Sequence, residues 1–142
     1  MADEAAPTGP AIEQLVVVIT SAAFEASLAF YRDVIGLEMV EEWTDAGHGA
    51  TLSAGGPARV ELIDLPESAH RVQTESLFIG LQVPRIGGIY ERAKAAGSEI
   101  IREPAERPWG GRGFVIRDPN GVALNIYTAY GEAPDPAKCV RR

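Results

Sequence analysis

The sequence predicts an α+β domain built from two βαβββ modules, at residues 12–65 and 75–128. Two observations carry this prediction. The order strand, helix, three strands occurs once in each half of the chain, and the pattern G-x-E-apolar-apolar-x-E follows the helix both times. The two copies of this pattern begin at Gly36 and Gly97. Because neither module can cover its own sheet, we expect the two modules to share one core.

The first module begins with a strand at 13–20 (EQLVVVIT), whose nearly continuous apolar side chains suggest burial on both faces. A helix follows. Its apolar positions recur at helical spacing, and a glycine is placed to end it in a left-handed conformation: Phe24, Leu28, Tyr31, Ile35 and Gly36. Three further strands are predicted at 38–44, 50–54 and 58–64, with a Gly-Gly-Pro turn before the last.

The second module repeats this order after a polar connector at 66–74. A strand is predicted at 76–83, followed by a helix that ends at Gly97. The apolar positions of this helix are Ile86, Ile89, Tyr90 and Ala93. Strands at 99–103, 112–118 and 122–128 complete the module. The last two are joined by Asp-Pro-Asn-Gly, a turn in which aspartate can bond the backbone and glycine accepts a positive φ.

The composition excludes several classes of partner. Thirteen Lys and Arg against twenty Asp and Glu leave a net charge of −7, which disfavours nucleic acid and anionic membranes. Residues 1–11 and 129–142 are rich in Pro, Ala and charge and are expected to be flexible tails. The start of the chain lacks the basic and apolar segments of a secretory signal, and the single cysteine, Cys139, cannot form an internal disulfide. We therefore expect a cytoplasmic protein.

Two stretches, SLAFYRDVIGLEMVEEW at 27–43 and PWGGRGFVIRDPNGVALNIY at 108–127, carry a family resemblance. With them the chain resembles the vicinal oxygen chelate superfamily, which includes glyoxalases, extradiol dioxygenases, fosfomycin-inactivating enzymes and bleomycin-resistance proteins. The resemblance implies paired βαβββ modules whose curved sheets form a cupped cleft, usually in a homodimer. Since this fold hosts many chemistries, the function must be argued from the site.

Metal-dependent members of the family hold a divalent ion with four inward-facing positions, filled by His, Glu or Gln, on the first and last strands of each module. The resemblance assigns these positions to Val16, Glu61, Phe78 and Asn125. Two extra residues in the first loop would move the first position to Gln14. Valine and phenylalanine offer no donor atom to Zn²⁺, Fe²⁺ or Ni²⁺, and His48 and His70 lie elsewhere, where we interpret them as solvated polar residues. The expectation is no metal and no cofactor.

Without a metal, the expected site is an apolar cleft with aromatic side chains at its edges. Trp43 ends a strand of the first module, and Trp109 stands beside two glycines before the strand at 112–118. In metal-free resistance proteins of the family, aromatic residues near such positions sandwich planar drug rings, and stacking contributes about 0.5–1.5 kcal/mol per pair. Either tryptophan can instead cover core. The expected ligand-binding residues are Trp43, Glu61, Phe78, Trp109, Arg112 and Asn125.

Glu61 and Asn125 are expected to face one cavity, because the repeat places them on equivalent final strands. Polar groups in an apolar cavity need partners, and the candidates are each other, Arg112, water or a ligand. Glu61 can act as a general base there. It can equally form a salt bridge with Arg59 or Arg112 at a dimer interface.

The leading hypothesis is a metal-independent homodimer that sequesters a bulky aromatic compound such as an antibiotic. The alternative is a lyase or isomerase of the glyoxalase type, either metal-dependent through other ligands or using Glu61 as the base. A third hypothesis is metal-free acid–base chemistry on a natural-product precursor. Only Val16 and Phe78 separate the first two, because neither side chain can bind a metal.

Overall fold

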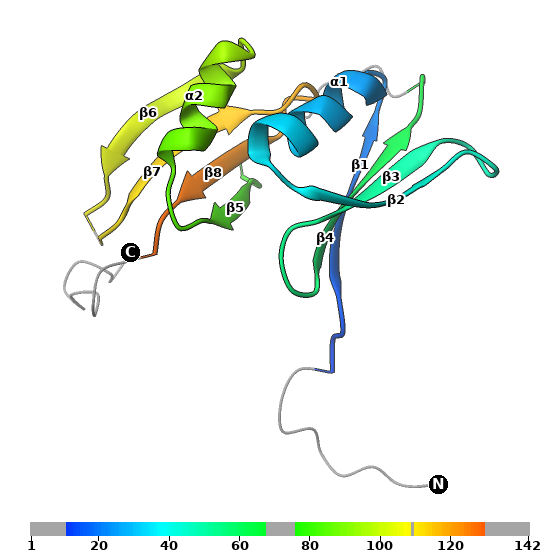
Figure 1. Cartoon of the computed structure of the whole chain (residues 1–142), viewed down its shortest axis with the longest axis horizontal. Helices are drawn as coiled ribbons and strands as arrows, with labels where there is room; N and C mark the ends of the chain where they lie inside the picture. Colours follow the sequence, from blue (N-terminus) through cyan, green and yellow to red (C-terminus); the bar gives the residue numbers. More distant parts are fainter. Residues whose placement is uncertain (1–10, 68–75, 109, 130–142) are drawn as a thin grey trace, which may run out of the picture.

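The computed structural model describes residues 11–67, 76–108 and 110–129 (Figure 1). The first module contains β1 (Leu15–Ser21), α1 (Phe24–Ala29), the π-helix η1 (Phe30–Ile35), β2 (Glu38–Trp43), β3 (Gly49–Ser53) and β4 (Ala58–Asp64). The second contains β5 (Ile79–Gln82), α2 (Gly87–Ala95), β6 (Glu99–Glu106), β7 (Arg112–Arg117) and β8 (Ala123–Tyr127). The expected tails, apart from residues 11 and 129, and most of the connector lie outside the described residues.

Each module forms a four-stranded mixed sheet. The strand orders are β1-β4-β3-β2 and β5-β8-β7-β6, and in both sheets the first pair is parallel and the others antiparallel. The predicted α+β architecture of two βαβββ modules is confirmed. No helix among the described residues is long and apolar enough to cross a membrane.

The elements differ from the predicted ones mainly at their ends. β5 begins at Ile79 rather than 76, β6 continues to Glu106, and the first helix changes to a π-helix at Phe30. Phe30 and its neighbour Tyr31 are both buried, at 5% and 0% exposure. Adjacent side chains of a helix point about 100° apart. Both are buried here because this helical segment has a sheet on each side.

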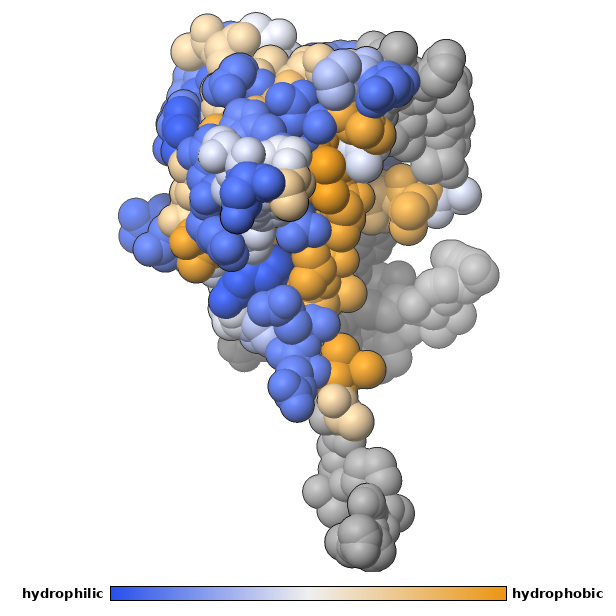
Figure 2. Space-filling view, turned by 90° about the vertical axis from the view of Figure 1, so that its right-hand side faces the viewer, coloured by the Kyte–Doolittle hydropathy of each residue, from blue (hydrophilic) through white to orange (hydrophobic). Residues whose placement is uncertain are grey.

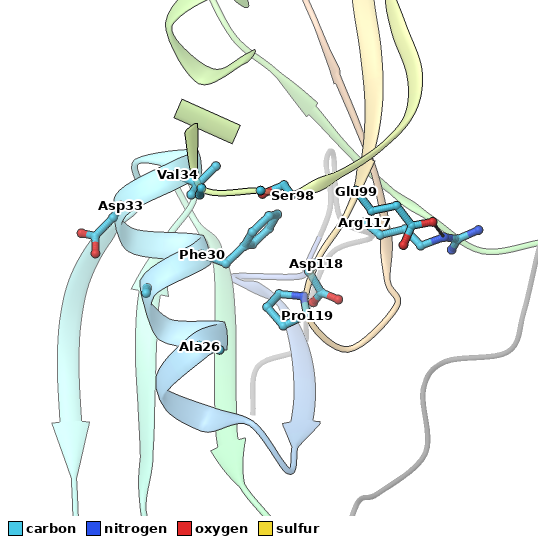
Figure 3. Close-up of a pocket in the computed structure, with 12 residues that line it drawn as sticks. Ala26, Phe30, Asp33, Val34, Ser98, Glu99, Arg117, Asp118 and Pro119 are labelled. Carbon is cyan, nitrogen blue, oxygen red and sulfur yellow. Dashed lines mark ion pairs between the residues drawn. The ribbon is translucent and has the colours of Figure 1, made fainter. Parts of the chain in front are cut away.

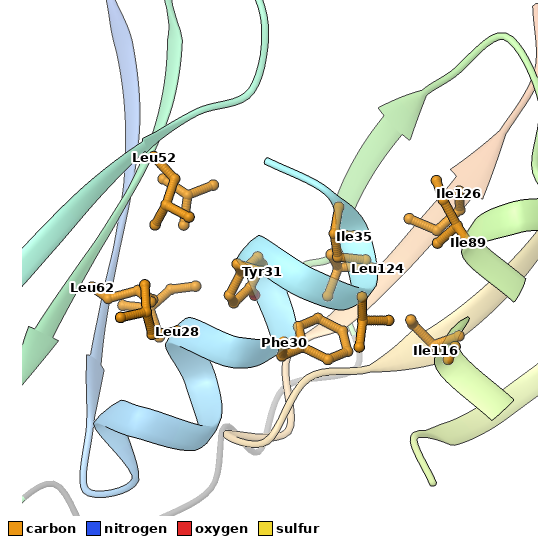
Figure 4. Packing of buried hydrophobic residues seen from close by; sticks show 14 of the residues in the cluster. Leu28, Phe30, Tyr31, Ile35, Leu52, Leu62, Ile89, Ile116, Leu124 and Ile126 are labelled. Atoms are coloured by element: carbon orange, nitrogen blue, oxygen red, sulfur yellow. The ribbon is translucent and has the colours of Figure 1, made fainter. Parts of the chain in front are cut away.

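One hydrophobic core joins the two modules. Figure 4 shows the helical segment 24–35 between the sheets, with Leu52 and Leu62 of the first sheet on one side. The second sheet covers the other side with Ile116, Leu124 and Ile126. All five of these sheet residues are fully buried. The expected shared core is therefore confirmed, and it lies around the first helix.

A buried polar network also links the modules at the turn that joins β7 to β8. Its members are Ser21, Ser27, Tyr31, Asp118 and Asn120, and we call it the junction network. The Tyr31 hydroxyl donates to Asp118 Oδ2 at 2.7 Å, and Asp118 Oδ1 accepts the backbone N–H groups of Asn120 and Val122 at 2.8 Å. Burial raises the pKa of the Tyr31 phenol well above its ordinary value, and the negative charge of Asp118 adds to this effect.

The junction network also ties β1 and α1 to this turn. The Ser21 hydroxyl donates to Asn120 Oδ1 at 2.6 Å, and Asn120 Nδ2 donates to Ser27 Oγ at 3.0 Å. Ser21 and Ser27 are themselves 3.0 Å apart. Both family-like stretches of the sequence thus contribute to one contact between the modules.

The sheet faces that do not pack on the helices are called here the open faces. In β4, Val60 and Leu62 are buried against the core, so Glu61 between them belongs to the open face. In β8, Asn125 lies in the same way between two buried residues. On the open face of β1, Val16 and Val18 are 37% and 52% exposed, so the expected burial of this strand on both faces is wrong: only one face packs on the core. Figure 2 shows a band of hydrophobic side chains on this side of the molecule.

Candidate functional site

The strand register places the four candidate positions equivalently in the two modules. Glu61 pairs with Val18, and Val16 stands two residues before Val18 on the same face. Asn125 pairs with Gly80, and Phe78 stands two residues before Gly80. The predicted equivalence of Glu61 and Asn125 is therefore confirmed.

The side chains at these positions do not fit a divalent metal. Glu61 and Asn125 supply oxygen donors, but Val16 and Phe78 supply none. A site with Gln14 in the first position would still lack a donor at Phe78. No group of three or more His, Cys, Asp or Glu within the described ranges could hold an ion.

Within one chain, Glu61 and Asn125 do not face one cavity, contrary to the prediction. The helical segment 24–35 lies between the sheets, so the two open faces point away from each other (Figure 1). Asn125 lines a cavity of about 180 Å³ that we call the module-two cavity. Its lining residues are Phe78, Gly80, Arg107, Gly110, Asn125, Tyr127 and Thr128, and Glu61 is not among them.

The polar centre of the module-two cavity is Arg107, which the sequence analysis missed. Its Nη2 atom donates to Asn125 Oδ1 at 2.9 Å. The guanidinium lies against Gly113 of β7, where a Cβ atom would stand 2.8 Å from Nη2 and 3.0 Å from Nε. A strand glycine that leaves room for another group was the one signal of this arrangement in the sequence.

The predicted partners of Asn125 and Glu61, Arg112 and Arg59, bond other groups in the structure. Arg112 is exposed and does not line the cavity, because the residue before Gly113 alternates to the other side of β7. Its backbone N–H donates to Thr128 Oγ1. The Arg59 guanidinium bonds the carbonyl oxygens of Gly56 and Ala58 rather than Glu61. No hydrogen bond or ion pair joins Glu61 to another described residue.

Of the two predicted tryptophans, only Trp43 is among the described residues, and it does not line this cavity. The half-buried indole of Trp43 packs directly on Gly49, its cross-strand neighbour in the first sheet, and lines neither cavity described in this section. Trp109 lies outside the described residues. Its sequence neighbour Gly110 lines the module-two cavity. Phe78, 57% exposed, is the expected aromatic residue that the structure does place at the cavity.

His48 is not the solvated residue that the sequence suggested. Its Nε2 lies 3.0 Å from Glu42 Oε2, its Nδ1 lies 3.3 Å from Asp64 Oδ2, and its ring packs on Phe24 at 4.2 Å. The hydrogen bond to Glu42 raises the pKa of His48, and Asp64 contributes in the same direction. The two carboxylates lie on opposite ring nitrogens, so the three groups cannot converge on one ion. His70 lies outside the described residues.

A larger cavity of about 610 Å³ lies at the module junction, on the helix side of the sheets (Figure 3). Phe30 points into it, opposite Ser98 and Pro119. Its three carboxylates already have partners. Asp33 pairs with Arg32 at 2.9 Å, Glu99 with Arg117 at 3.5 Å, and Asp118 accepts the Tyr31 hydroxyl. Although this cavity is the larger, the module-two cavity is the better candidate site because Arg107 retains unused donors there.

Comparison with solved structures supports the fold. TioX from Micromonospora sp. ML1 is 20% identical with a TM-score of 0.62, covering 81% of this chain and 97% of its own. The oxidase ChaP-H2 is 21% identical with a TM-score of 0.66, covering 87% and 98%. Lactoylglutathione lyase from Agrobacterium tumefaciens is 20% identical with a TM-score of 0.57, covering 87% and 95%.

These identities establish a shared fold, and the names include both a lyase and an oxidase, so they do not specify one reaction. No curated protein matches the chain. The sequence profile of one family matches residues 13–126, which contain both modules. The chain therefore belongs to the Glyoxalase/Bleomycin resistance protein/Dioxygenase superfamily.

Proposed function

We propose that the chain is a metal-independent, cytoplasmic binding protein that sequesters an aromatic small molecule, such as an antibiotic. The observation that carries this proposal is the presence of Val16 and Phe78 at two of the four positions where metal-dependent relatives hold an ion. Neither side chain can coordinate a metal. Phe78 instead offers a largely exposed ring at the module-two cavity, where it can stack on a planar ligand.

The proposal includes a homodimer, because one chain does not enclose a ligand. The module-two cavity measures about 180 Å³, whereas pockets for small molecules usually span about 300–1,000 Å³. The missing wall cannot come from the first sheet of the same chain, whose open face points away. A second copy can supply it with its own first sheet, and the exposed Val16 and Val18 give that face an apolar character suited to burial.

The binding function is tested by thermal unfolding of the chain with a panel of aromatic antibiotics. A ligand at one hundred times its Kd stabilises the folded state by about 2.7 kcal/mol. Phe78→Ala should remove this stabilisation. Leu77→Ala is the matched control, because Leu77 is 74% exposed but does not line the cavity. Stabilisation that survives Phe78→Ala undiminished would refute the proposed site.

A glyoxalase-type lyase or isomerase is the second candidate, favoured by the carboxylate of Glu61 on the open face, which has no partner among the described residues. Glu61→Gln separates the two functions, because an amide keeps the shape but cannot take a proton at neutral pH. In a binding protein this change alters affinity modestly. In an enzyme it abolishes turnover of α-keto thiol adducts while leaving their binding nearly intact.

A further inference from the structure

Within the part of the chain that the structure describes, most side-chain donors of Arg107 have no acceptor. A guanidinium carries five N–H donors, and one of them bonds Asn125 Oδ1. None of the others donates to a described residue. The side chain is half-buried, so its charge is only partly exposed to water. Such a group favours an acceptor that arrives with a ligand.

The rest of the module-two cavity adds donors and no negative charge. None of the seven described residues that line it carries a carboxylate. Asn125 uses its oxygen to accept from Arg107, which leaves its NH₂ group without an acceptor among the described residues. Tyr127 and Thr128 add two hydroxyl groups. An excess of donors around a cation is the pattern of a site for an anion.

The surrounding backbone holds Arg107 in place. Its N–H donates to the Gly111 carbonyl at 2.9 Å, and its carbonyl accepts the Gly110 N–H at 2.9 Å. Gly110 and Gly111 adopt φ values of 104° and 78°, which permit this tight loop. On the far side, the guanidinium rests on Gly113. The charge is therefore fixed before any ligand binds, which lowers the entropic cost of recognition.

We infer that the module-two cavity selects an aromatic ligand that carries a carboxylate. This inference rests on the proposed binding function and adds the chemical class of the ligand. The ring would contact Phe78, while the carboxylate oxygens would accept from Arg107 and the Asn125 amide. A carboxylate matches the planar fork of the guanidinium, which makes Arg107 the residue that determines specificity.

The test compares 1-naphthoate with 1-naphthamide, which share ring and shape but differ in charge, by calorimetric titration of the full chain. The wild type should bind naphthoate at least about tenfold more tightly, the ratio expected from one charge-assisted hydrogen bond. Arg107→Gln should abolish this preference while retaining naphthamide binding. Arg85→Gln is the matched control, because it removes one exposed positive charge that does not line the cavity.

Three results would overturn the inference. Equal affinity for both probes, with Phe78→Ala weakening both, would leave an aromatic-binding site without selection for an anion. If the wild type binds both probes equally but Glu61→Gln prefers naphthoate, then Glu61 of a second copy already neutralises Arg107. Binding of neither probe by any variant would refute the inference, and the antibiotic panel would then decide separately whether the proposed function fails with it.

Discussion

The module junction and the open faces are opposite in character. At the junction, Ser21, Ser27 and Asp118 are at most 3% exposed, and their side chains are hydrogen-bonded to one another or to nearby groups. On the open faces, Val18 and Phe78 are more than half exposed, and no described helix or strand covers them. The junction holds the two modules together, whereas the open faces carry surface that is available to a ligand or to a second copy.

The same contrast shows which part of the molecule the two family-like stretches of the sequence build. Residues 27–43 contribute Ser27 and Tyr31 to the junction network, and residues 108–127 contribute Asp118 and Asn120. Much of the resemblance therefore rests on residues that build the fold. Of the proposed ligand contacts, Phe78 and Arg107 lie outside these two stretches, whereas Asn125 lies within the second.

The largest expected effect comes from breaking the junction. Asp118→Ala removes the acceptor of the buried Tyr31 hydroxyl and of two backbone N–H groups. Leaving buried donors unsatisfied should lower the free energy of unfolding by about 3–4 kcal/mol, measured by urea denaturation. Asp33→Ala is the control, because this carboxylate is exposed on the neighbouring helix and should contribute almost nothing. Equal effects of the two variants would show that the junction does not stabilise the fold.

The next largest effect is expected from a substitution on the open face of the first sheet. In the proposed dimer, Val18→Asp places a charge in an apolar interface and should weaken association by about 2–3 kcal/mol. Sedimentation should then show monomers at concentrations where the wild type is dimeric, with unchanged secondary structure. Val40→Asp serves as the control, since Val40 is 54% exposed at the bulge of edge strand β2. A monomeric wild type would contradict the dimer directly.

The smallest effect is expected at His48, which belongs neither to the module junction nor to the open faces. Its contacts with Glu42 and Asp64 tie the β2–β3 hairpin to β4. Its pKa in the folded chain is raised, chiefly by Glu42, so protonation stabilises the fold. This contribution is complete below the ordinary pKa of 6.5 and is lost as the pH rises through the higher folded value. The free energy of unfolding of the wild type should therefore fall relative to that of His48→Gln as the pH rises from 6.5 through the higher folded pKa. Parallel curves for the two proteins would rule out this coupling.

Local patterns in the sequence were sufficient for the fold but not for every strand face, because the strand expected to be buried on both faces exposes Val16 and Val18. The resemblance assigned Glu61 to a site position, and in the structure the two-residue period of β4 puts this side chain on the open face. Contacts between distant residues were not predictable in this way. Tyr31 and Asp118 are 87 positions apart, and neither the helical stripe nor the turn motif indicated that they touch.

The candidate site was predicted less completely for the same physical reason. Arg107 lies in a loop after β6, where no periodicity assigns a side chain to a face, and β6 itself extends three residues beyond its predicted end. His48 was misinterpreted because its partners Glu42 and Asp64 reach it only through the pairing of three strands. The separation of Glu61 from Asn125 follows from the helix between the sheets, a tertiary feature that the repeat alone does not fix.

We propose that the open faces bind an organic ligand without a metal. A calorimetric titration of the chelator-treated chain with Zn²⁺, Ni²⁺, Mn²⁺ and Fe²⁺, performed in parallel on Glu61→Gln, tests whether the site is free of metal. Because Val16 and Phe78 supply no donors, we expect no stoichiometric site at micromolar metal and no difference between the two proteins. Stoichiometric binding by the wild type that Glu61→Gln abolishes would contradict the account.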